Sequence, residues 1–450
     1  MLDKLLRLSV GWLSSIVFIY GIIQKYILFP IYLSNLSSGE NFYAKALYIR
    51  LKGGRIFSIF ALPTLYSFIC TVLILFIFHY FVTSLKDSRK PAIIKIFWAV
   101  LMVMGTFNLL LTQSFGGIVY LGAGGLIYLL GSGILKSRYL IPALSVLALI
   151  LFITTALRFK EVKKLEPVKL RFSNWVQASR IIADYPFWGV GLGNYESTIS
   201  AYTLSHEAKS IYSHNFFLQF TAESGIVVPV VLLLFLFLYR KKLNPGNPDD
   251  KTLYLAVLAA LFFYNLIDIG LYFFSAGIIA VVVLSQLYPS KQPLLKFNGQ
   301  KIATLSVFLI LSTFLVVEAI SDSSRKEGDF LNSQKEYDSA TVFYKRSLKV
   351  NPFNYKAMVG LANIMFSGPD SNEAQHYLQQ ALALNPDYPY ANFLQSRVLY
   401  KQKRYLKSFY YAQTAHQKNK LNPVYKKWAD ALHKNLAEAL KQQKAPQESL

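Results

Sequence analysis

Long apolar runs dominate the first 321 residues of the chain, whereas residues 322–450 have the mixed polarity of a soluble domain. Because a helix needs about 20 apolar residues to cross a membrane, these runs predict about nine spans. The apolar stretch 252–289 is divided into two spans at Asp268-Ile-Gly270, where a polar hairpin tip fits. The predicted spans lie near residues 10–32, 59–83, 93–113, 115–135, 139–157, 217–239, 252–270, 271–289 and 302–320.

This pattern predicts an all-α protein with two domains. Residues 1–321 would form a polytopic helical membrane bundle, and residues 322–450 a domain of helical repeats. The composition agrees, because 54% of the residues are apolar and only 16% are charged, below the usual quarter for soluble domains. The abundant Phe and Tyr are typical of membrane cores and interface belts. The single Cys70 lies in an apolar run, which leaves no disulfide and no Cys-based metal site.

Clusters of Lys and Arg in five short segments predict the orientation, because such residues collect on the cytoplasmic side. With nine alternating spans, all five segments fall on the same side. The N-terminus is then cytoplasmic, and the loop 34–58, the long loop 158–216 and the repeat domain lie outside. The basic residues concerned are Lys4, Arg7, Lys86, Arg89, Lys90, Lys95, Lys136, Arg138, Arg240, Lys241, Lys242, Lys291, Lys296 and Lys301.

The two outer loops are basic as well, against this rule. Between residues 158 and 216 the long loop carries eight Lys and Arg residues against five acidic ones. Charge alone leaves two interpretations open. The loop is either a solvated face that contacts anionic lipid headgroups, or a surface that collects a phosphate or pyrophosphate substrate, for which Arg offers a planar fork.

An internal repeat marks the C-terminal domain. Leu348-Lys-Val-Asn351-Pro352 recurs 34 residues later as Leu382-Ala-Leu-Asn385-Pro386, and a weaker third copy runs from Tyr405 to Asn422-Pro423 with about three extra residues. A 34-residue helix–turn–helix unit closed by Pro is the tetratricopeptide signature, and such units stack into an α-solenoid. A solenoid of about three repeats would either recruit a protein or glycan partner or only pack on the membrane domain.

Several familiar catalytic motifs are absent from the sequence. It contains no nucleotide P-loop, no His-Glu-x2-His, no Cys/His cluster and no Asp-x-Asp. No metal, cofactor or nucleic-acid partner is therefore predicted. The run Gly189-Val-Gly191-Leu-Gly193 lacks the preceding strand of a dinucleotide-binding fold, so it is interpreted as a flexible turn.

The segment 171–225 has a distinctive order of residues. Arg171-Phe-Ser-Asn-Trp175 comes first, then Asp184-Tyr-Pro-Phe-Trp-Gly-Val-Gly-Leu-Gly-Asn194, then His214-Asn215, with Leu218 and Glu223 four and nine residues after the histidine. In this order and spacing the chain resembles the O-antigen ligase and polysaccharide polymerase family of bacterial membrane glycosyltransferases. The resemblance extends more loosely over residues 45–289, including Asn265-Leu-Ile-Asp268, and does not cover the repeats.

The chain departs from the family pattern in two places. Family members usually have about a dozen spans, so the bundle is expected to be short at its N-terminus. Many members carry Ser-Arg-Gly where this chain has Gln113-Ser-Phe115-Gly-Gly117, and Phe115 removes a cation that would serve the donor phosphate. Arg55, at the outer end of the second span, is the expected substitute.

The resemblance implies transfer of a glycan from a polyprenyl pyrophosphate carrier to an acceptor hydroxyl, without a metal or a nucleotide sugar. Arg171 would stabilise the charge on the leaving pyrophosphate, and His214 would be the general base. The substrate-binding residues are then Arg55, Arg180, Trp175, Asn215 and Glu223. The residues alone leave structural roles open, at the membrane interface for His214 and Trp175, and as a hydrogen bond to a neighbouring helix for Glu223.

The predicted function is a glycosyltransferase of the bacterial cytoplasmic (inner) membrane that acts outside the cytoplasm. Its acceptor would be a lipid, a growing glycan or a protein. The alternative from another class is a non-catalytic membrane scaffold or transporter subunit that recruits partners through its repeats. A flippase is less favoured, because few charged groups lie within the predicted spans.

Overall fold

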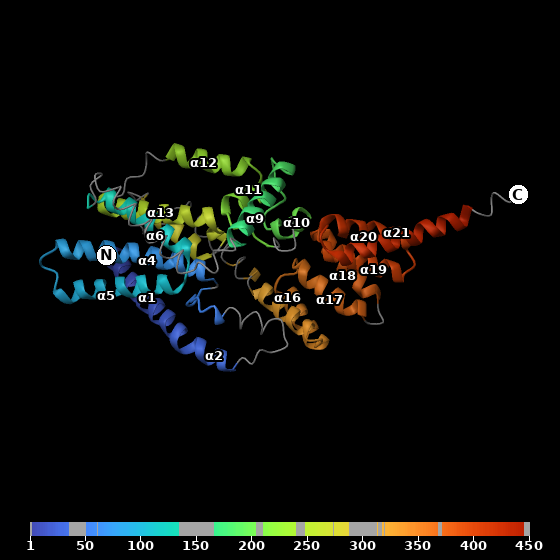
Figure 1. Ribbon diagram of the computed structural model, residues 1–450, viewed down its shortest axis with the longest axis horizontal. Helices are drawn as coiled ribbons and strands as arrows, with labels where there is room; N and C mark the ends of the chain where they lie inside the picture. The colour runs from blue at the N-terminus through green and yellow to red at the C-terminus, as the bar shows by residue number, and fades with distance from the viewer. Residues whose placement is uncertain are drawn as a thin grey trace, which may run out of the picture. The chain divides into compact units, whose positions relative to one another are not determined.

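The computed structural model describes residues 2–35, 51–60, 62–134, 166–203, 210–239, 248–272, 274–287, 313, 317–318, 320–367 and 371–444. Every regular element in these ranges is a helix, which confirms the predicted all-α class (Figure 1). The chain falls into two compact units. Unit 1 comprises residues 1–175, 212–221 and 226–290, and unit 2 comprises residues 176–211, 222–225 and 291–450. Part of the predicted long loop thus groups with the repeats, and the functional division at residue 321 stays a prediction.

Unit 1 contains the helices with the most apolar sequences. They are α1 (Leu2–Ile23), the π-helical turn η1 (Gln24–Leu28), α2 (Phe29–Asn35), α4 (Pro63–Lys86), α5 (Ala92–Leu111), α6 (Phe115–Gly131), most of α11 (Phe216–Ser224), α12 (Val227–Tyr239), α13 (Pro248–Ile267), the short 3-10 turn η5 (Gly270–Tyr272) and α14 (Phe274–Leu287).

Four of these stretches are long and apolar enough to cross a membrane: Leu6–Ser34, Pro63–Lys86, Ala92–Leu111 and Asp250–Ile267. Two shorter apolar helices, α6 and α14, match further predicted spans. The predicted count of about nine is not confirmed. The predicted span 139–157 and most of 302–320 lie outside the described residues.

One predicted span is broken. Residues 217–239 were expected to form a single helix, but α11 and α12 meet at an angle of 118° around Gly225. Gly225 has a positive φ of 74°, a conformation that a helix cannot contain. The hydropathy of a sequence does not reveal such a break, because the break depends on the backbone angle of one residue.

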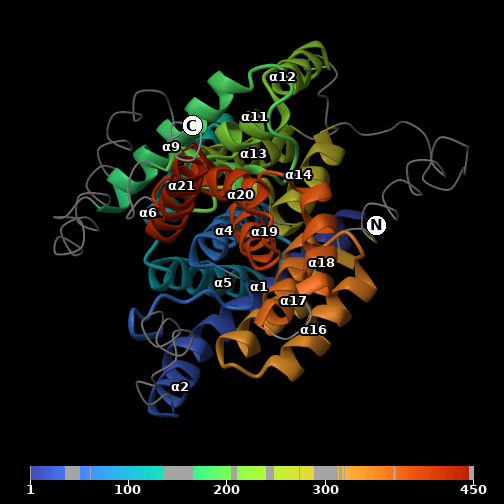
Figure 2. The same cartoon turned by 90° about the vertical axis from the view of Figure 1, so that its right-hand side faces the viewer.

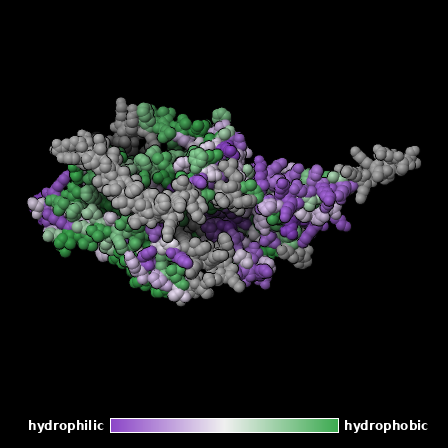
Figure 3. Space-filling view, in the orientation of Figure 1, coloured by the Kyte–Doolittle hydropathy of each residue, from purple (hydrophilic) through white to green (hydrophobic). Residues whose placement is uncertain are grey.

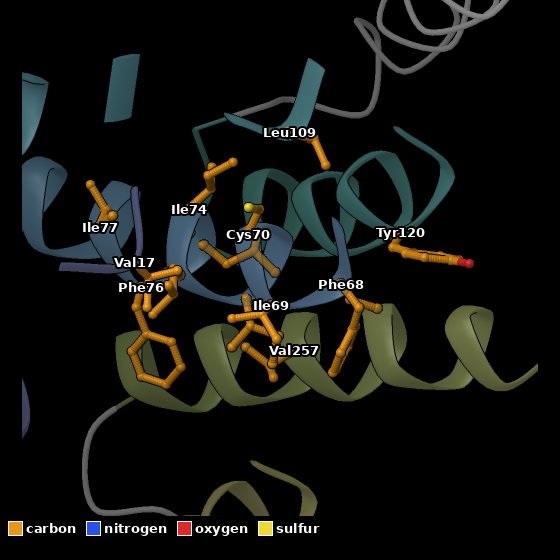
Figure 4. Packing of buried hydrophobic residues seen from close by; sticks show 14 of the residues in the cluster. Val17, Phe68, Ile69, Cys70, Ile74, Phe76, Ile77, Leu109, Tyr120 and Val257 are labelled. Atoms are coloured by element: carbon orange, nitrogen blue, oxygen red, sulfur yellow. The ribbon is translucent and has the colours of Figure 1, made fainter. Parts of the chain in front are cut away.

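Helix α4 lies at the centre of unit 1. It contacts α1, α5, α6 and α13, and its residues from Leu65 to Ile77 are all buried. Figure 4 shows Ile69 and Phe68 of this helix pointing toward α13, near Val257, and Cys70 on the opposite side of the helix. A helix buried on every side needs no polar face, which explains why apolar residues occur on all sides of α4.

The outward faces of unit 1 are hydrophobic as well. Trp12 of α1 is 70% exposed and Val103 of α5 is 67% exposed. The space-filling view shows this apolar surface on unit 1 and a hydrophilic surface on the repeat helices (Figure 3). An apolar exterior is expected of helices that face lipid.

Unit 2 contains the C-terminal part of α9 (Glu166–Asp184), α10 (Tyr195–Tyr202) and three helix pairs. The pairs are α16 (Tyr337–Val350) with α17 (Tyr355–Ser367), α18 (Ser371–Leu384) with α19 (Pro389–Lys401), and α20 (Tyr405–Lys418) with α21 (Pro423–Lys444). Consecutive helices lie beside one another (Figures 1 and 2).

The helix pairs follow a strict 34-residue register. Their first helices begin at Tyr337, Ser371 and Tyr405. Small residues occupy equivalent buried positions, at Ala340, Ala374 and Ser408. The third copy therefore has no extra residues, contrary to the prediction. Pro423 corresponds to Pro389 at the start of the second helix, and Asn419, not Asn422, corresponds to Asn385.

Candidate functional site

The segment before α11 is attached firmly to the end of α13. Asn215 caps α11, because its Oδ1 accepts a hydrogen bond from the Leu218 N–H at 3.0 Å, while its Nδ2 donates to the Leu266 carbonyl at 3.1 Å. The Phe216 N–H donates to the Asp268 carbonyl at 3.0 Å. These contacts fix the residue just before the cap, His214, beside the first residue after α13, Asp268.

His214 and Asp268 form a close pair. The His214 Nδ1 lies 3.3 Å from the Asp268 Oδ1, and the histidine side chain is 36% exposed while the carboxylate is 5% exposed. His214 also has a φ of 53°, a left-handed conformation that costs a non-glycine residue of the order of 1–3 kcal/mol. The surrounding hydrogen bonds hold it there, and such strain is characteristic of functional positions.

The environment of Asp268 keeps it ionised. Burial raises the pKa of the Asp268 carboxyl. The hydrogen bond to His214, the charge of that ring when protonated, the Ile269 N–H at 3.0 Å and the Thr64 hydroxyl together outweigh burial, so the pKa lies below its usual value. A charged Asp268 orients the imidazole with Nδ1–H toward itself, which leaves Nε2 as the basic nitrogen.

Arg171 and Trp175 reach the same region from α9. They are four residues apart and therefore share one face of the helix. The Trp175 Nε1–H donates to the His214 carbonyl at 3.4 Å. Arg171 interacts electrostatically with the hydroxyl of Tyr120, a buried residue of α6 that also interacts with Asp268. The structure thus brings Arg171, Trp175 and His214 together.

Two tyrosines line the inner side of this group. The rings of Tyr120 and Tyr264 meet edge to face with centroids 5.2 Å apart, and both hydroxyls interact with the Asp268 charge. Among the described residues, the buried Tyr264 hydroxyl has no hydrogen-bond partner. Sequence analysis did not assign these tyrosines or Asp268 to the site. The polar Asn265-Leu-Ile-Asp268 at the end of an apolar run was the available signal.

Arg55 lies beside the turn that leads into α6. Its Nε–H donates to the Thr112 carbonyl at 2.9 Å. Ser114 caps α6 and accepts a hydrogen bond from Ser67 of α4 at 3.1 Å. The neighbouring α4 residue Thr64 is the one that contacts Asp268. Arg55 is therefore close in the fold to the segment where Phe115 stands.

Glu223 has a different environment. Its side chain is buried, and Oε2 accepts a hydrogen bond from the Gly193 N–H at 3.0 Å. Its backbone carbonyl accepts from the Gly191 N–H at 2.9 Å. A Cβ at Gly225 would lie 1.9 Å from the Phe187 carbonyl oxygen. The glycine-rich run is therefore a turn, as predicted, and it is held against the break between α11 and α12.

Arg180 faces away from Arg171. The two residues are nine positions apart on α9, and nine residues turn an α-helix by about half a revolution beyond two full turns. Arg180 belongs to unit 2, where it lines a cleft with Asp184 and Tyr202. The Tyr202 hydroxyl donates to Asp184 Oδ2 at 2.5 Å.

Comparison with known proteins bears on this site. Residues 99–235 match the family model of O-antigen ligase. The match includes Arg171, Trp175 and His214, and it supports a membrane glycosyltransferase-like function. It covers under a third of the chain. Asp268, Arg55 and the repeats lie outside the matched O-antigen ligase region.

No curated protein matches the chain. Among solved structures, the first TPR of Spaghetti (RPAP3) bound to the HSP90 peptide SRMEEVD is similar, at 17% sequence identity and a TM-score of 0.26. That similarity covers 27% of this chain and 95% of the other.

Proposed function

We propose that the protein is a membrane glycosyltransferase of the O-antigen ligase and polymerase type. It transfers a glycan from a polyprenyl pyrophosphate carrier to a hydroxyl of a lipid, glycan or protein acceptor outside the cytoplasm. One observation carries this proposal: the His214–Asp268 pair is fixed beside Trp175, one helical turn from Arg171, and both His214 and Arg171 lie in the region that matches the O-antigen ligase family.

The geometry supports direct transfer of the glycan. The His214 Nε2 takes the proton of the acceptor hydroxyl as its oxygen forms a bond to the anomeric carbon of the donor sugar. The bond from that carbon to the pyrophosphate oxygen breaks, and the electron pair leaves with the polyprenyl pyrophosphate. Asp268 stabilises the imidazolium that forms, and Arg171 stabilises the charge on the leaving group.

Arg55 supports the donor side of the site. Its position next to residues 112–114 places a cation near the N-terminus of α6. Helix N-termini favour anions because their N–H groups and dipole point toward them. Arg55 and the first turn of α6 would together replace the cation that Phe115 removes.

Other residues that were predicted to bind substrate hold the catalytic segment in position. Both polar atoms of the Asn215 amide engage backbone groups, and the Glu223 carboxylate binds the Gly193 N–H. Trp175 contacts the His214 carbonyl. These contacts hold the catalytic segment in place, and any contact of these side chains with substrate stays a prediction.

Complementation of a strain that lacks the gene tests the proposal. Wild type, His214→Ala and Arg171→Ala are compared for surface glycan at matched membrane levels. His433→Ala and Arg89→Ala, at exposed positions, are the matched controls. The two site variants should lose glycan while the controls retain it. Full glycan in both site variants would overturn the enzymatic function and favour the scaffold alternative.

A further inference from the structure

Unit 2 contains a cleft of about 710 Å³ between the loop helices and the repeats. One wall comes from the end of α9 and from α10, with Arg180, Tyr185 and Tyr202. The other wall comes from turns between repeat helices, with Asp387, Lys418 and Lys420. A cleft of this size falls in the range of small-molecule and cofactor sites, about 300–1,000 Å³.

The two walls are joined by specific contacts. The Ser200 hydroxyl of α10 donates to the Lys418 carbonyl at 2.7 Å. Glu196, also on α10, pairs with Lys356 at the start of α17 at 2.5 Å. Because the 34-residue register places the repeat turns along one edge, α10 meets several of them. The cleft is thus a built feature of this unit.

The acidic side chains of the cleft have partners, whereas two of its basic side chains have no carboxylate partner among the described residues. Asp184 accepts the Tyr202 hydroxyl, and Asp387 pairs with Lys418 at 2.7 Å. Both acids that line the cleft therefore have partners. Neither Arg180 nor Lys420 pairs with a carboxylate among the described residues, and both side chains are exposed. Two cations are left to receive an anionic ligand.

The remaining lining suits a sugar. Tyr185 is 42% exposed and presents an aromatic ring, while Thr198, Thr203 and Gln417 supply hydroxyl and amide groups. Tyrosine combines an apolar ring with a polar tip, and hydroxyl and amide groups both donate and accept hydrogen bonds. Inorganic phosphate would use only the cations and would leave most of the volume unfilled.

We propose that this cleft binds an oligosaccharide that carries an acidic group, a carboxylate or a phosphate. Arg180 and Lys420 bind the acidic group, and Tyr185 stacks on a sugar ring. The repeats then act as one wall of a glycan site. This inference rests on the proposed function only because it expects glycans to be present near the cleft. The residues that line the cleft are not the ones proposed to perform transfer.

Direct binding to the full-length protein in detergent tests the inference. The probes are oligosaccharides with uronate groups, oligosaccharides with phosphate groups, their neutral counterparts and inorganic phosphate. Arg180→Gln with Lys420→Gln should weaken binding of at least one acidic class about 10-fold or more, since charge-assisted hydrogen bonds are lost. Binding of the neutral probes should change little. Tyr185→Ala should weaken both acidic and neutral probes.

A charge-matched control is Lys407→Gln with Lys427→Gln, which removes two exposed cations outside the cleft and should leave binding unchanged. His214→Ala should bind the acidic probes like wild type, so that a failure of transfer chemistry is distinguished from a failure of the cleft. Equal binding by the double cleft variant and wild type would overturn the inference. So would the absence of binding by every acidic probe, or equal affinity for inorganic phosphate.

Discussion

At the scale of single residues, the proposed mechanism depends on the pair of His214 and Asp268. The histidine is held in a left-handed conformation, and its ring faces a carboxylate that is almost fully buried. Two elements far apart in the sequence supply the pair, since Asp268 follows α13 and His214 precedes α11. The imidazole is therefore oriented by tertiary structure, and this orientation can be tested by changing its partner.

Asp268→Asn should lower the rate of glycan transfer while preserving the shape of the site. His214→Ala removes the proton acceptor and is expected to lower the rate by about 10²–10⁴-fold. Asp268→Asn should have a smaller effect, because the base is retained without its charged partner.

The double variant separates a catalytic pair from two independent residues. If His214 and Asp268 act together, the double variant should be no slower than His214→Ala in a transfer assay with purified protein. Multiplication of the two single effects would show that the two residues act independently and would contradict a catalytic pair.

The pH dependence of stability should also report on Asp268. Its folded pKa is below its usual value, so the carboxylate stabilises the fold at pH values above that usual value of about 3.9. This contribution is lost as the pH falls through the folded pKa. The difference in Tm between wild type and Asp268→Asn in detergent should therefore shrink as the pH falls below about 4. A difference that grows as the pH falls below about 4 would contradict this assignment.

At the scale of elements, the sequence predicted some helices well and missed how one of them is broken. The predicted spans 59–83 and 93–113 correspond closely to α4 and α5, because long apolar runs report burial in lipid or protein. The hairpin tip at Asp268-Ile-Gly270 was also confirmed. The break at Gly225 was not predictable, since it depends on a distant turn that includes Phe187. The prediction placed the end of the third repeat three residues too late, because Asn422-Pro423 has the same sequence as the Asn-Pro pairs at 351–352 and 385–386.

A pair of glycine substitutions tests the break between α11 and α12. In Gly225→Ala the new Cβ would lie 1.9 Å from the Phe187 carbonyl oxygen, which no side-chain movement can relieve. In Gly193→Ala, where φ is 79°, nothing lies within 4 Å, so only the left-handed strain of about 1–2 kcal/mol is expected.

The first variant should fail to give a monodisperse peak in detergent size-exclusion chromatography, while the second should retain one. Equal, intact profiles for both would show that the turn does not pack against the break.

At the scale of the whole molecule, residue order located the site better than composition did. The basic character of the long loop left lipid contact and substrate binding equally open, whereas the ordered motif pointed to Arg171 and His214. The structure brings these two residues together through Trp175 and Tyr120. Asp268 could not be placed from the sequence, because its pairing requires α11 and α13 to be adjacent in space. Arg180 shared the basic loop but faces the opposite side of α9.

The orientation in the membrane is the remaining whole-molecule prediction, and single cysteines can test it. Cys70 is the single cysteine of the chain, so a Cys70→Ala background contains no cysteine to label. Ser88→Cys, in the exposed turn between α4 and α5, should be cytoplasmic, and Lys407→Cys, on the exposed face of α20, should be outside. A membrane-impermeant thiol reagent should therefore label Lys407→Cys but not Ser88→Cys in intact spheroplasts, and both after permeabilisation. The reverse pattern would place the repeats and the cleft in the cytoplasm, where an acceptor on the outer surface could not reach them.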